Sequence, residues 1–468
     1  MTLLARATGA IVGGFLFIAT CGFRTEEANL QIPDYIVTAA PIYEVHAALK
    51  GGERFPEGAH LLLVHNGKAV PLAPEFAASA DAAVNFDAKK ILFSGKKTVS
   101  DHWQIWEMTL ADHSVRQVTS GNEDAIRPLY LPLGRLVYAE HTEQGFRMIS
   151  SRVNDTAEIR GIDLPGIPSV FPISFAGASA IPDDVLADGR ILFESEFPMG
   201  KGSIPEMYLT YADGSGVESY RCDHGVARWG GQQLADGDVV FTHGTTLARF
   251  TPSLAHEAKI AAPAVFYAGS IQEMPAGSWL LSAKMRGSAK FSIAQWQPGT
   301  STLKAVFEQP RENLVEPVAI AARVRPKRHP SALHPWKYAN LLALDTRLSR
   351  DGALGGVPAR VRLEMESREG RAIVLGTAPV EQDGSFFIQV PGDAPIRMAV
   401  LDEKGEVLRQ ERGWFWARAG EQRICVGCHT GPERAAENRL PEVLQKTTVP
   451  VDLTGSTAGL SSGEGSHR

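Results

Sequence analysis

Three residues near the end of the chain, Cys425, Cys428 and His429, form the pattern Cys-x-x-Cys-His. Two thiols with this spacing can reach the two vinyl groups of one porphyrin and attach it through thioether bonds. The adjacent imidazole then lies beneath the iron as the proximal ligand. The pattern therefore predicts one covalently attached haem c.

A redox disulfide and half of a zinc site use similar spacings. A thioredoxin-like motif opens a helix within a βαβ unit, and no such pattern surrounds residues 425–429. A tetrahedral zinc site needs further ligands, and the remaining cysteines, Cys21 and Cys222, do not form a second pair. Haem attachment is the interpretation that the segment favours.

The sixth ligand of such an iron is less evident. None of the 39 residues after His429 is a methionine, and His467 lies in a Ser/Gly-rich tail that we expect to be disordered. We favour His334 as the sixth ligand, and an open five-coordinate iron is the alternative. Further candidates around the haem are His329, Met365 and Met398 as ligands, Trp414, Phe415 and Trp416 as porphyrin walls, and Arg418 and Arg423 as propionate partners.

The N-terminus indicates export. Arg6 precedes an apolar stretch over residues 7–20, which is short for a membrane span of ~20 residues and typical of a signal peptide. An anchor helix that stays in the membrane is the alternative. Cys21 followed by Gly22 resembles a lipoprotein cleavage site, so residues 1–21 predict either a lipidated or a simply cleaved protein. We expect a periplasmic or membrane-anchored location.

The middle of the chain repeats a short unit, in which a turn with Asp or Gly precedes three or four apolar β-formers. Its copies centre on Leu92, Val137, Leu192, Val240 and Leu280, with spacings of 45, 55, 48 and 40 residues. A period of ~40–50 residues is typical of propeller blades, each a four-stranded sheet. We predict a β-propeller of six or seven blades over residues 40–325, with Leu61-Leu62-Leu63-Val64 starting or closing a blade. A large β-sandwich is the alternative.

The sequence changes character after the repeats. Residues 326–358 are basic and proline-rich, and we expect a linker and the entry to the haem domain. Alternating apolar strands with Asp-Gly and Lys-Gly turns over residues 359–450 predict a small β-sandwich-like domain that carries the haem. We expect residues 451–468 to be a disordered tail, so the whole fold is all-β.

Composition excludes several classes of protein. Hydrophobic residues make up 44% and charged residues 21%, as in folded globular proteins. The 47 basic and 53 acidic residues give a net charge of −6, so bulk charge does not favour nucleic-acid binding. The repeats contain no Gly-x-Ser-x-Gly elbow and no Gly-rich phosphate loop, which leaves the propeller as a scaffold.

A resemblance extends these interpretations. The run from Gly376 to Val380, the run from Asp383 to Phe387, and the stretch from Trp414 into His429 resemble the C-terminal part of hydrazine synthase alpha subunit-like proteins. The strands from Val84 to Met108 resemble the propeller that forms the middle domain of that family. The resemblance implies a periplasmic propeller cytochrome whose C-terminal haem is bis-His ligated and passes electrons. The family's N-terminal catalytic haem domain has its own attachment motif, and we expect it to be absent, because only one Cys-x-x-Cys-His is present.

We therefore expect an exported monohaem c-type cytochrome that transfers electrons to or from a partner protein. The alternatives are a haem enzyme, or a subunit of one, that acts on a small molecule at an open iron site, and a binding module in which the propeller recognises a partner. We expect a redox partner protein, no nucleic acid, and a lipid anchor if Cys21 is modified.

Overall fold

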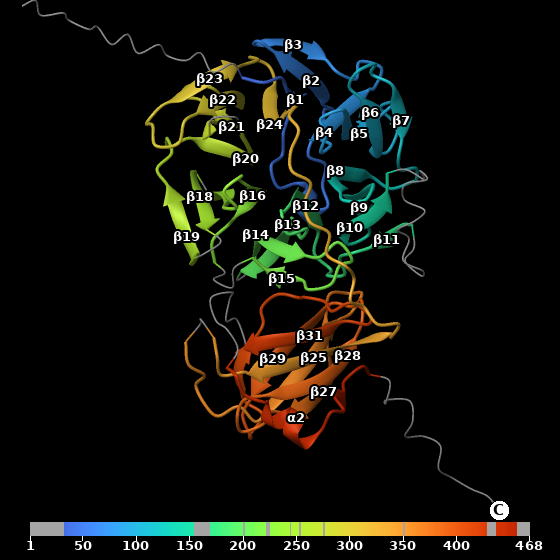
Figure 1. Cartoon of the computed structure of the whole chain (residues 1–468), viewed down its shortest axis with the longest axis vertical. Coiled ribbons are helices and arrows are strands. Elements are labelled where there is room, and N and C mark those ends of the chain that lie inside the picture. Colours follow the sequence, from blue (N-terminus) through green and yellow to red (C-terminus); the bar gives the residue numbers. More distant parts are fainter. Residues whose placement is uncertain are drawn as a thin grey trace, which may run out of the picture. The chain divides into compact units, whose positions relative to one another are not determined.

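The computed structural model describes residues 32–153, 169–199, 202–220, 225–243, 245–251, 254–274, 277–349, 352–427 and 437–455. Within them the chain forms eight four-stranded sheets, and six of these are arranged around an axis as a β-propeller (Figure 1). The other two belong to the C-terminal part. The predicted all-β class and propeller are confirmed, and the described residues contain six blades.

Each blade has four antiparallel strands. Blade one contains β24 (Asn313–Ala319), β1 (Tyr35–Ala40), β2 (His60–His65) and β3 (Lys68–Pro71). Blades two and three contain β4 (Ala78–Val84), β5 (Lys90–Lys96), β6 (Gln104–Thr109) and β7 (Val115–Gln117), then β8 (Ala125–Leu131), β9 (Arg135–Thr142), β10 (Gly145–Arg152) and β11 (Phe171–Pro172). Blade four contains β12 (Ala180–Val185), β13 (Ile191–Met199), β14 (Gly202–Thr210) and β15 (Glu218–Ser219). Blades five and six contain β16 (Trp229–Gln233), β17 (Val239–His243), β18 (Thr246–Thr251) and β19 (Leu254–Ile260), then β20 (Phe266–Glu273), β21 (Trp279–Lys284), β22 (Ser292–Trp296) and β23 (Leu303–Phe307).

The ring is closed by strands from distant parts of the chain. The first strands β4, β8, β12, β16 and β20 line the axis, and β24 takes the same place in blade one. β24 pairs with β1, so that Ile36 lies opposite Val318. The three outer strands of blade one come from the start of the propeller segment and its innermost strand comes from the end.

The repeated motif forms the second strand of blades two to six. These strands are buried on both faces because neighbouring blades cover them, which explains why they are continuously apolar. The turns before them have the expected chemistry: Gly189 has a φ of 91°, and Asp188 accepts a hydrogen bond from the backbone N–H of Arg190 at 3.0 Å. The second strand of blade one is β1, and its partner β24 is not joined to it by a turn. It therefore lacks the motif, and the sequence repeat shows only five copies. Leu61–Val64, expected to start or close a blade, lie in β2, the third strand of blade one.

A loop between β1 and β2, residues 41–59, occupies one end of the propeller axis, and we call it the plug loop. It contains a short 3-10 helix, η1 (Ala48–Lys50). Its buried apolar side chains pack against a ring of residues from the innermost strands. The plug loop contributes Ala48, Leu49 and Phe55, and the innermost strands contribute Ala80, Ile126, Ile181, Ala268 and Val315.

The C-terminal part is a sandwich of two sheets. One has the order β31 (Gln422–Gly427), β25 (Tyr338–Asp345), β28 (Phe386–Pro391) and β32 (Val451–Asp452). The other has the order β27 (Ala372–Pro379), β26 (Arg360–Glu366), β29 (Ile396–Leu401) and β30 (Val407–Gln410). One core contains residues from both sheets, among them Leu341, Val361, Leu363, Ile388 and Ile396. β25 lies within residues 326–358, which we expected as a linker and domain entry, and it is an inner strand of its sheet.

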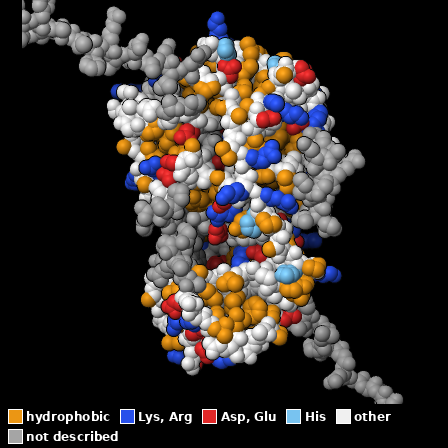
Figure 2. Space-filling view, viewed as in Figure 1, with side chains coloured by type: hydrophobic (Ala, Val, Ile, Leu, Met, Phe, Trp, Pro, Cys, Tyr) orange, Lys and Arg blue, Asp and Glu red, His pale blue; other side chains and the backbone are white. Residues whose placement is uncertain are grey.

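The edges of the sandwich differ in chemistry. β31 is an edge strand and runs parallel to β25, with Cys425 opposite Ala343. β27 is an edge of the other sheet, and Figure 2 shows apolar side chains gathered over it. Ile373 and Val374 on β27 are 45% and 57% exposed. The five-residue helix α2 (Glu442–Lys446) follows β31 in the chain. No helix within the described ranges is long and apolar enough to span a bilayer.

Candidate functional site

Cys425 lies near the end of β31, on the edge of its sheet. Its thiol is half-buried and is not part of a disulfide. Because side chains alternate along a strand, Cys425 and Arg423 lie on one face, and Ile424, which is 66% exposed, lies on the other. The first cysteine of the attachment motif is thus held by a regular strand and is reachable from the surface.

Charged groups surround this thiol. Burial raises the pKa of Cys425; Arg423 opposes this shift, and the nearby carboxylates Glu411, Glu421 and Glu218 reinforce it. Burial also raises the pKa of Glu411 to about 7, against a smaller opposing effect of Arg423. The segment therefore presents a protonated thiol beside one guanidinium and several carboxyl groups.

The other predicted attachment residues lie outside the described residues. These are Cys428 and His429, and the same holds for Cys21 and Cys222. The described part of the chain contains no group of three His, Cys, Asp or Glu side chains that could hold a metal ion.

His334 lies at the opposite end of β31 from Cys425. Its backbone N–H donates to the carbonyl oxygen of Gly420 at 2.9 Å, and its exposed ring stacks on Trp336 at 4.4 Å. Gly420 precedes Cys425 by five residues, which corresponds to roughly 16 Å along a strand. The structure does not bring His334 to Cys425.

The other residues considered around the haem have partners of their own. The rings of His329 and Tyr211 stack at 3.9 Å, and Met365 and Met398 pack against the sandwich core. Trp416 is 3% exposed and belongs to a hydrophobic cluster with blades three and four. Arg418 and Arg423 form ion pairs with Asp393 and Glu421, at 2.6 and 2.7 Å, and Trp414 lies under Arg397.

The C-terminal part is fastened to the propeller through Trp416 and the residues after it. The Trp416 indole N–H donates to the carbonyl oxygen of Gly214 at 2.8 Å. Glu421 accepts a hydrogen bond from the backbone N–H of Gly216 at 3.1 Å, and Arg423 donates to the carbonyl oxygen of Val217 at 3.3 Å. These bonds lie immediately before Cys425, so the attachment segment leaves directly from the propeller contact.

A second cluster of charged groups lies at the propeller axis. All six innermost strands have a register shift at their middle, which is a β-bulge. Asp81, Arg127 and Glu316 lie at these bulges with φ of 59°, 55° and 56°. A bulge re-aims the side chain at its position, and here charged side chains from separate blades converge on the axis.

Arg54 of the plug loop joins these groups into one buried network. Its guanidinium bonds to Asp81 of blade two at 2.5 Å and to Glu316 of blade one. Arg127 of blade three bonds to Glu316 at 2.7 Å and to Asp183 of blade four at 2.8 Å. The network therefore ties four blades and the plug loop together.

The electrostatics follow from burial and pairing. Burial disfavours the charge of Asp81, but Arg54, Arg127 and hydrogen bonds outweigh it and lower its pKa. Burial raises the pKa of Asp183 well above its usual value, and the neighbouring Glu194 raises it further. The pKa values of these two buried carboxyl groups are therefore shifted in opposite directions.

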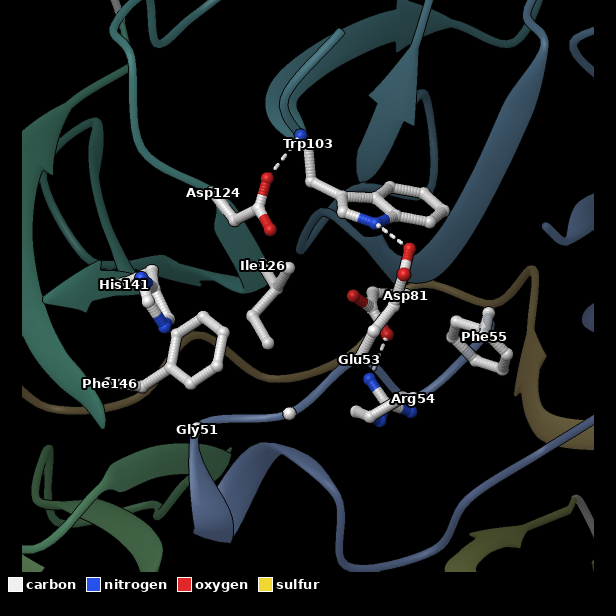
Figure 3. A pocket seen from close by; sticks show the side chains of 11 residues that line it. Gly51, Glu53, Arg54, Phe55, Asp81, Trp103, Asp124, Ile126, His141 and Phe146 are labelled. Atoms are coloured by element: carbon white, nitrogen blue, oxygen red, sulfur yellow. Dashed lines mark hydrogen bonds and ion pairs between the residues drawn. The ribbon is translucent and has the colours of Figure 1, made fainter. Parts of the chain in front are cut away.

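Two cavities adjoin the network. The larger, about 150 Å³, lies between the plug loop and blades two and three, where Trp103, Asp124 and Phe146 form part of its wall (Figure 3). The smaller, about 30 Å³, is lined by groups that include Trp229 and Glu316. The Trp229 indole N–H and Oε2 of Glu316 are buried without a hydrogen-bond partner, and such a polar space suits one or two water molecules.

Comparison with known proteins agrees with the predicted resemblance. Residues 350–430 match the family described as hydrazine synthase alpha subunit middle domain. Hydrazine synthase subunit alpha of Kuenenia stuttgartiensis is 38% identical over 61 residues, which are 13% of this chain and 8% of that protein. The solved Kuenenia stuttgartiensis hydrazine synthase matches 89% of this chain and 72% of its own, with a TM-score of 0.76 and 18% identity. Residues 350–430 are therefore similar in sequence to this family, and most of the chain shares the fold of the solved synthase.

The two parts of the chain differ in how closely they match these proteins. The family match lies on the C-terminal sandwich and includes the whole Cys-x-x-Cys-His segment, whereas we expected the propeller to resemble the middle domain. The fold match extends to both parts, because it covers 89% of the chain. TolB from Acinetobacter baumannii matches 61% of this chain and 66% of its own, with 14% identity and a TM-score of 0.44.

Sequence reasoning found the attachment motif but missed the propeller axis. Asp81, Arg127 and Asp183 each stand within an apolar strand, nine to eleven residues before the central residue of a repeat copy. A charged residue recurring at that place was the available signal. Among the described residues, no other blade has a loop of this kind between its second and third strands, so the plug loop could not be found from the repeat.

Proposed function

We propose that this protein is an exported c-type cytochrome with one covalently attached haem, which transfers electrons to or from a partner protein. The observation that carries the proposal is the attachment motif, whose first thiol is free and half-buried at the end of β31. The family match to residues 350–430 covers the motif and supports the proposal.

The three residues of the attachment motif have the chemistry that covalent attachment of a haem requires. The Cys425 thiol would add its sulfur to one carbon of a porphyrin vinyl group and its hydrogen to the other, a reaction that needs a reduced thiol. Cys428 would do the same at the second vinyl group, and His429 would ligate the iron. The bound haem would supply one-electron oxidation and reduction. Arg423 lies on the same face as Cys425, but its guanidinium is already ion-paired with Glu421 at 2.7 Å.

The test is attachment of haem in a host that matures c-type cytochromes. The mature protein should stain for haem on a denaturing gel and cycle reversibly in electrochemistry. The double variant Cys425→Ala, Cys428→Ala should lose the stain, and the control Cys222→Ala should keep it. A wild-type protein that accumulates in that host without covalent haem would refute the proposal.

The position of His334 favours one alternative enough to test it. Since His334 lies roughly 16 Å along the strand from Cys425, an open iron that acts on a small molecule is the second candidate function. Carbon monoxide should leave the spectrum of the ferrous protein unchanged if a sixth ligand is bound, and shift it if the iron is open. His334→Ala should open the iron only if His334 is the sixth ligand.

Export is part of the same proposal. Mass spectrometry of the mature N-terminus should show a lipid on Cys21 or a simple cleavage. An intact Met1 on the mature protein would contradict both forms of processing.

A further inference from the structure

The larger propeller cavity has the size of a small organic molecule. Its volume is about 150 Å³, which is the space that a benzene-sized ligand fills. It lies between the plug loop and the first strands of blades two and three (Figure 3). Gly51 lines the cavity, and a Cβ on Gly51 would lie 3.4 Å from the Cα of Gly145.

Aromatic side chains form much of the wall. Phe55, Trp103 and Phe146 line the cavity together with Ile126, and each of these is buried. The rings of His141 and Phe146 pack edge to face at 5.1 Å. Aromatic faces attract cations as well as apolar groups.

Trp103 holds a carboxylate on each side of itself. Its backbone N–H donates to Asp124 at 2.9 Å, and its indole N–H donates to Glu53 at 3.2 Å. Figure 3 shows the Asp124 carboxylate beside the backbone N–H of Trp103 and the Glu53 carboxylate beside its indole N–H. Each of them is partly exposed, so each has oxygen atoms that can accept a hydrogen bond from a ligand. A cavity with aromatic walls and two fixed acceptors suits a ligand that carries N–H groups and positive charge.

Two of the aromatic walls already carry a cation, with the Arg54 guanidinium 4.8 Å from the centre of the Phe55 ring and Lys96 beside Trp103, so Asp124 is the acceptor that a cationic ligand would use. The Arg54 guanidinium also lines the cavity, but it is paired with both Asp81 and Glu316. The Lys96 ammonium bonds to the Glu53 carboxylate at 3.3 Å and lies 5.1 Å from the centre of the Trp103 ring. An ammonium group therefore already contacts both an indole and a carboxylate at this cavity. Asp124 faces a histidine, His102, rather than a lysine or arginine. The described residues here form no cluster that could hold a metal ion.

We propose that this cavity binds a small primary alkylammonium ion. Asp124 accepts hydrogen bonds from the ammonium group, and the alkyl chain lies against Phe55, Phe146 and Trp103. The site is independent of the haem and goes beyond electron transfer. The ligand is a free amine of about the size of butylamine, because the volume leaves room for about six non-hydrogen atoms.

Calorimetric titration of the full mature protein tests the proposal with matched probes. n-Butylammonium and 1-butanol have the same number of non-hydrogen atoms and differ in charge. Because a hydrogen bond to a charged group is stronger than a neutral one, n-butylammonium should bind about tenfold more tightly or better. Tetramethylammonium is charged but has no N–H group, and it should bind more weakly than n-butylammonium. Equal affinity for n-butylammonium and 1-butanol, or no binding of either, would overturn the proposal.

Variants locate the binding. Asp124→Asn keeps an oxygen to accept the Trp103 N–H and removes the charge, so it should weaken n-butylammonium binding about tenfold. Asp112→Asn removes the same charge from an exposed turn of blade two and should leave binding unchanged. Unchanged affinity in Asp124→Asn, with a native circular dichroism spectrum, would refute the site. Tighter binding of Nα-acetyl-lysine methylamide than of n-butylammonium would overturn its assignment to a free amine.

Discussion

Replacing Arg54 by methionine should show how far the buried charge network holds the propeller together. Arg54 is 7% exposed and connects the plug loop to Asp81 and Glu316 on two blades. Methionine keeps a long, unbranched side chain of similar reach but leaves both carboxylates without this cation. Arg127 still bonds to Glu316 through its guanidinium and to Asp81 through its backbone N–H.

The expected loss follows from this geometry. Removing one partner of a buried ion pair costs about 3–5 kcal/mol, because a charge is left buried and unpaired. Since Arg127 remains, we expect the lower end, about 3 kcal/mol, which is a large part of a total stability of about 5–15 kcal/mol. For a ring of this size the melting temperature should fall by about 6 °C.

The loss should depend on pH in a defined direction. In the wild-type protein the pKa of Asp81 is lowered, so its contribution to stability is present above its unfolded pKa of about 3.9 and is lost as pH falls through its folded pKa. In Arg54→Met, burial of Asp81 acts with less opposition, so the folded pKa rises and protonation relieves the cost as pH falls. The difference between the two proteins should therefore be largest near pH 7 and shrink towards pH 4.

Thermal unfolding of both proteins at several pH values is the assay. Arg147→Met removes an exposed ion pair with Glu140 on blade three and serves as the control, with an expected loss below about 1 kcal/mol. Adding Asp81→Asn to Arg54→Met should restore part of the loss. The reasoning fails if Arg54→Met melts within 1–2 °C of the wild type at pH 7, or if its deficit does not change with pH.

Three further predictions concern the C-terminal part. Trp416→Phe leaves the carbonyl oxygen of Gly214 without its donor and should lower the free energy of unfolding in urea by about 1–2 kcal/mol. Trp416→Ala also removes the buried ring and should lower it by about 3–5 kcal/mol. If both variants are as stable as the wild type, this side chain is not buried as described. The pKa of Glu411 is raised to about 7, so stability should fall as pH rises from about 4.5 to 7, by roughly 1–3 kcal/mol, and Glu411→Gln should remove this slope. Gly420 has a φ of 85° and a Cβ there would overlap the backbone of His334, so Gly420→Ala should be strongly destabilising by thermal melting, and a variant as stable as wild type would contradict this close approach.

The sequence could predict elements whose physics is local. The second strands of the blades are apolar over several residues because both faces are covered, and the turns before them need Asp and Gly, so five copies of the unit could be recognised. The repeat unit could not be recognised in blade one, because β1 pairs with a strand almost 280 residues later and no turn connects them. The attachment motif could be recognised for the same reason, since its three residues lie within five positions.

The propeller axis could not be predicted because its residues meet only in the fold. Arg54, Asp81, Arg127 and Glu316 are spread over more than 260 positions, and each reads alone as a polar residue in a strand or loop. The propeller contact of Trp416 could not be predicted either. Because Trp416 follows Trp414 and Phe415, we interpreted the three aromatic residues together as walls of a haem site. The hydrogen bond of Trp416 to Gly214 spans 202 positions. Long-range pairing of this kind leaves no periodic signal in the sequence.

The closure of blade one by β24 also imposes an order of assembly. During synthesis, β1 cannot pair with β24 until residues 313–319 have been made. Joining segments so far apart in the chain carries an entropic cost of about 5 kcal/mol. Until then, blade one exposes the edge of β1, and the ring is open beside blade six. Closure therefore comes late and is expected to be slow, as is typical of pairings between distant strands. The attachment motif is made about a hundred residues after β24, so the ring has its last strand before Cys425 exists to receive a cofactor.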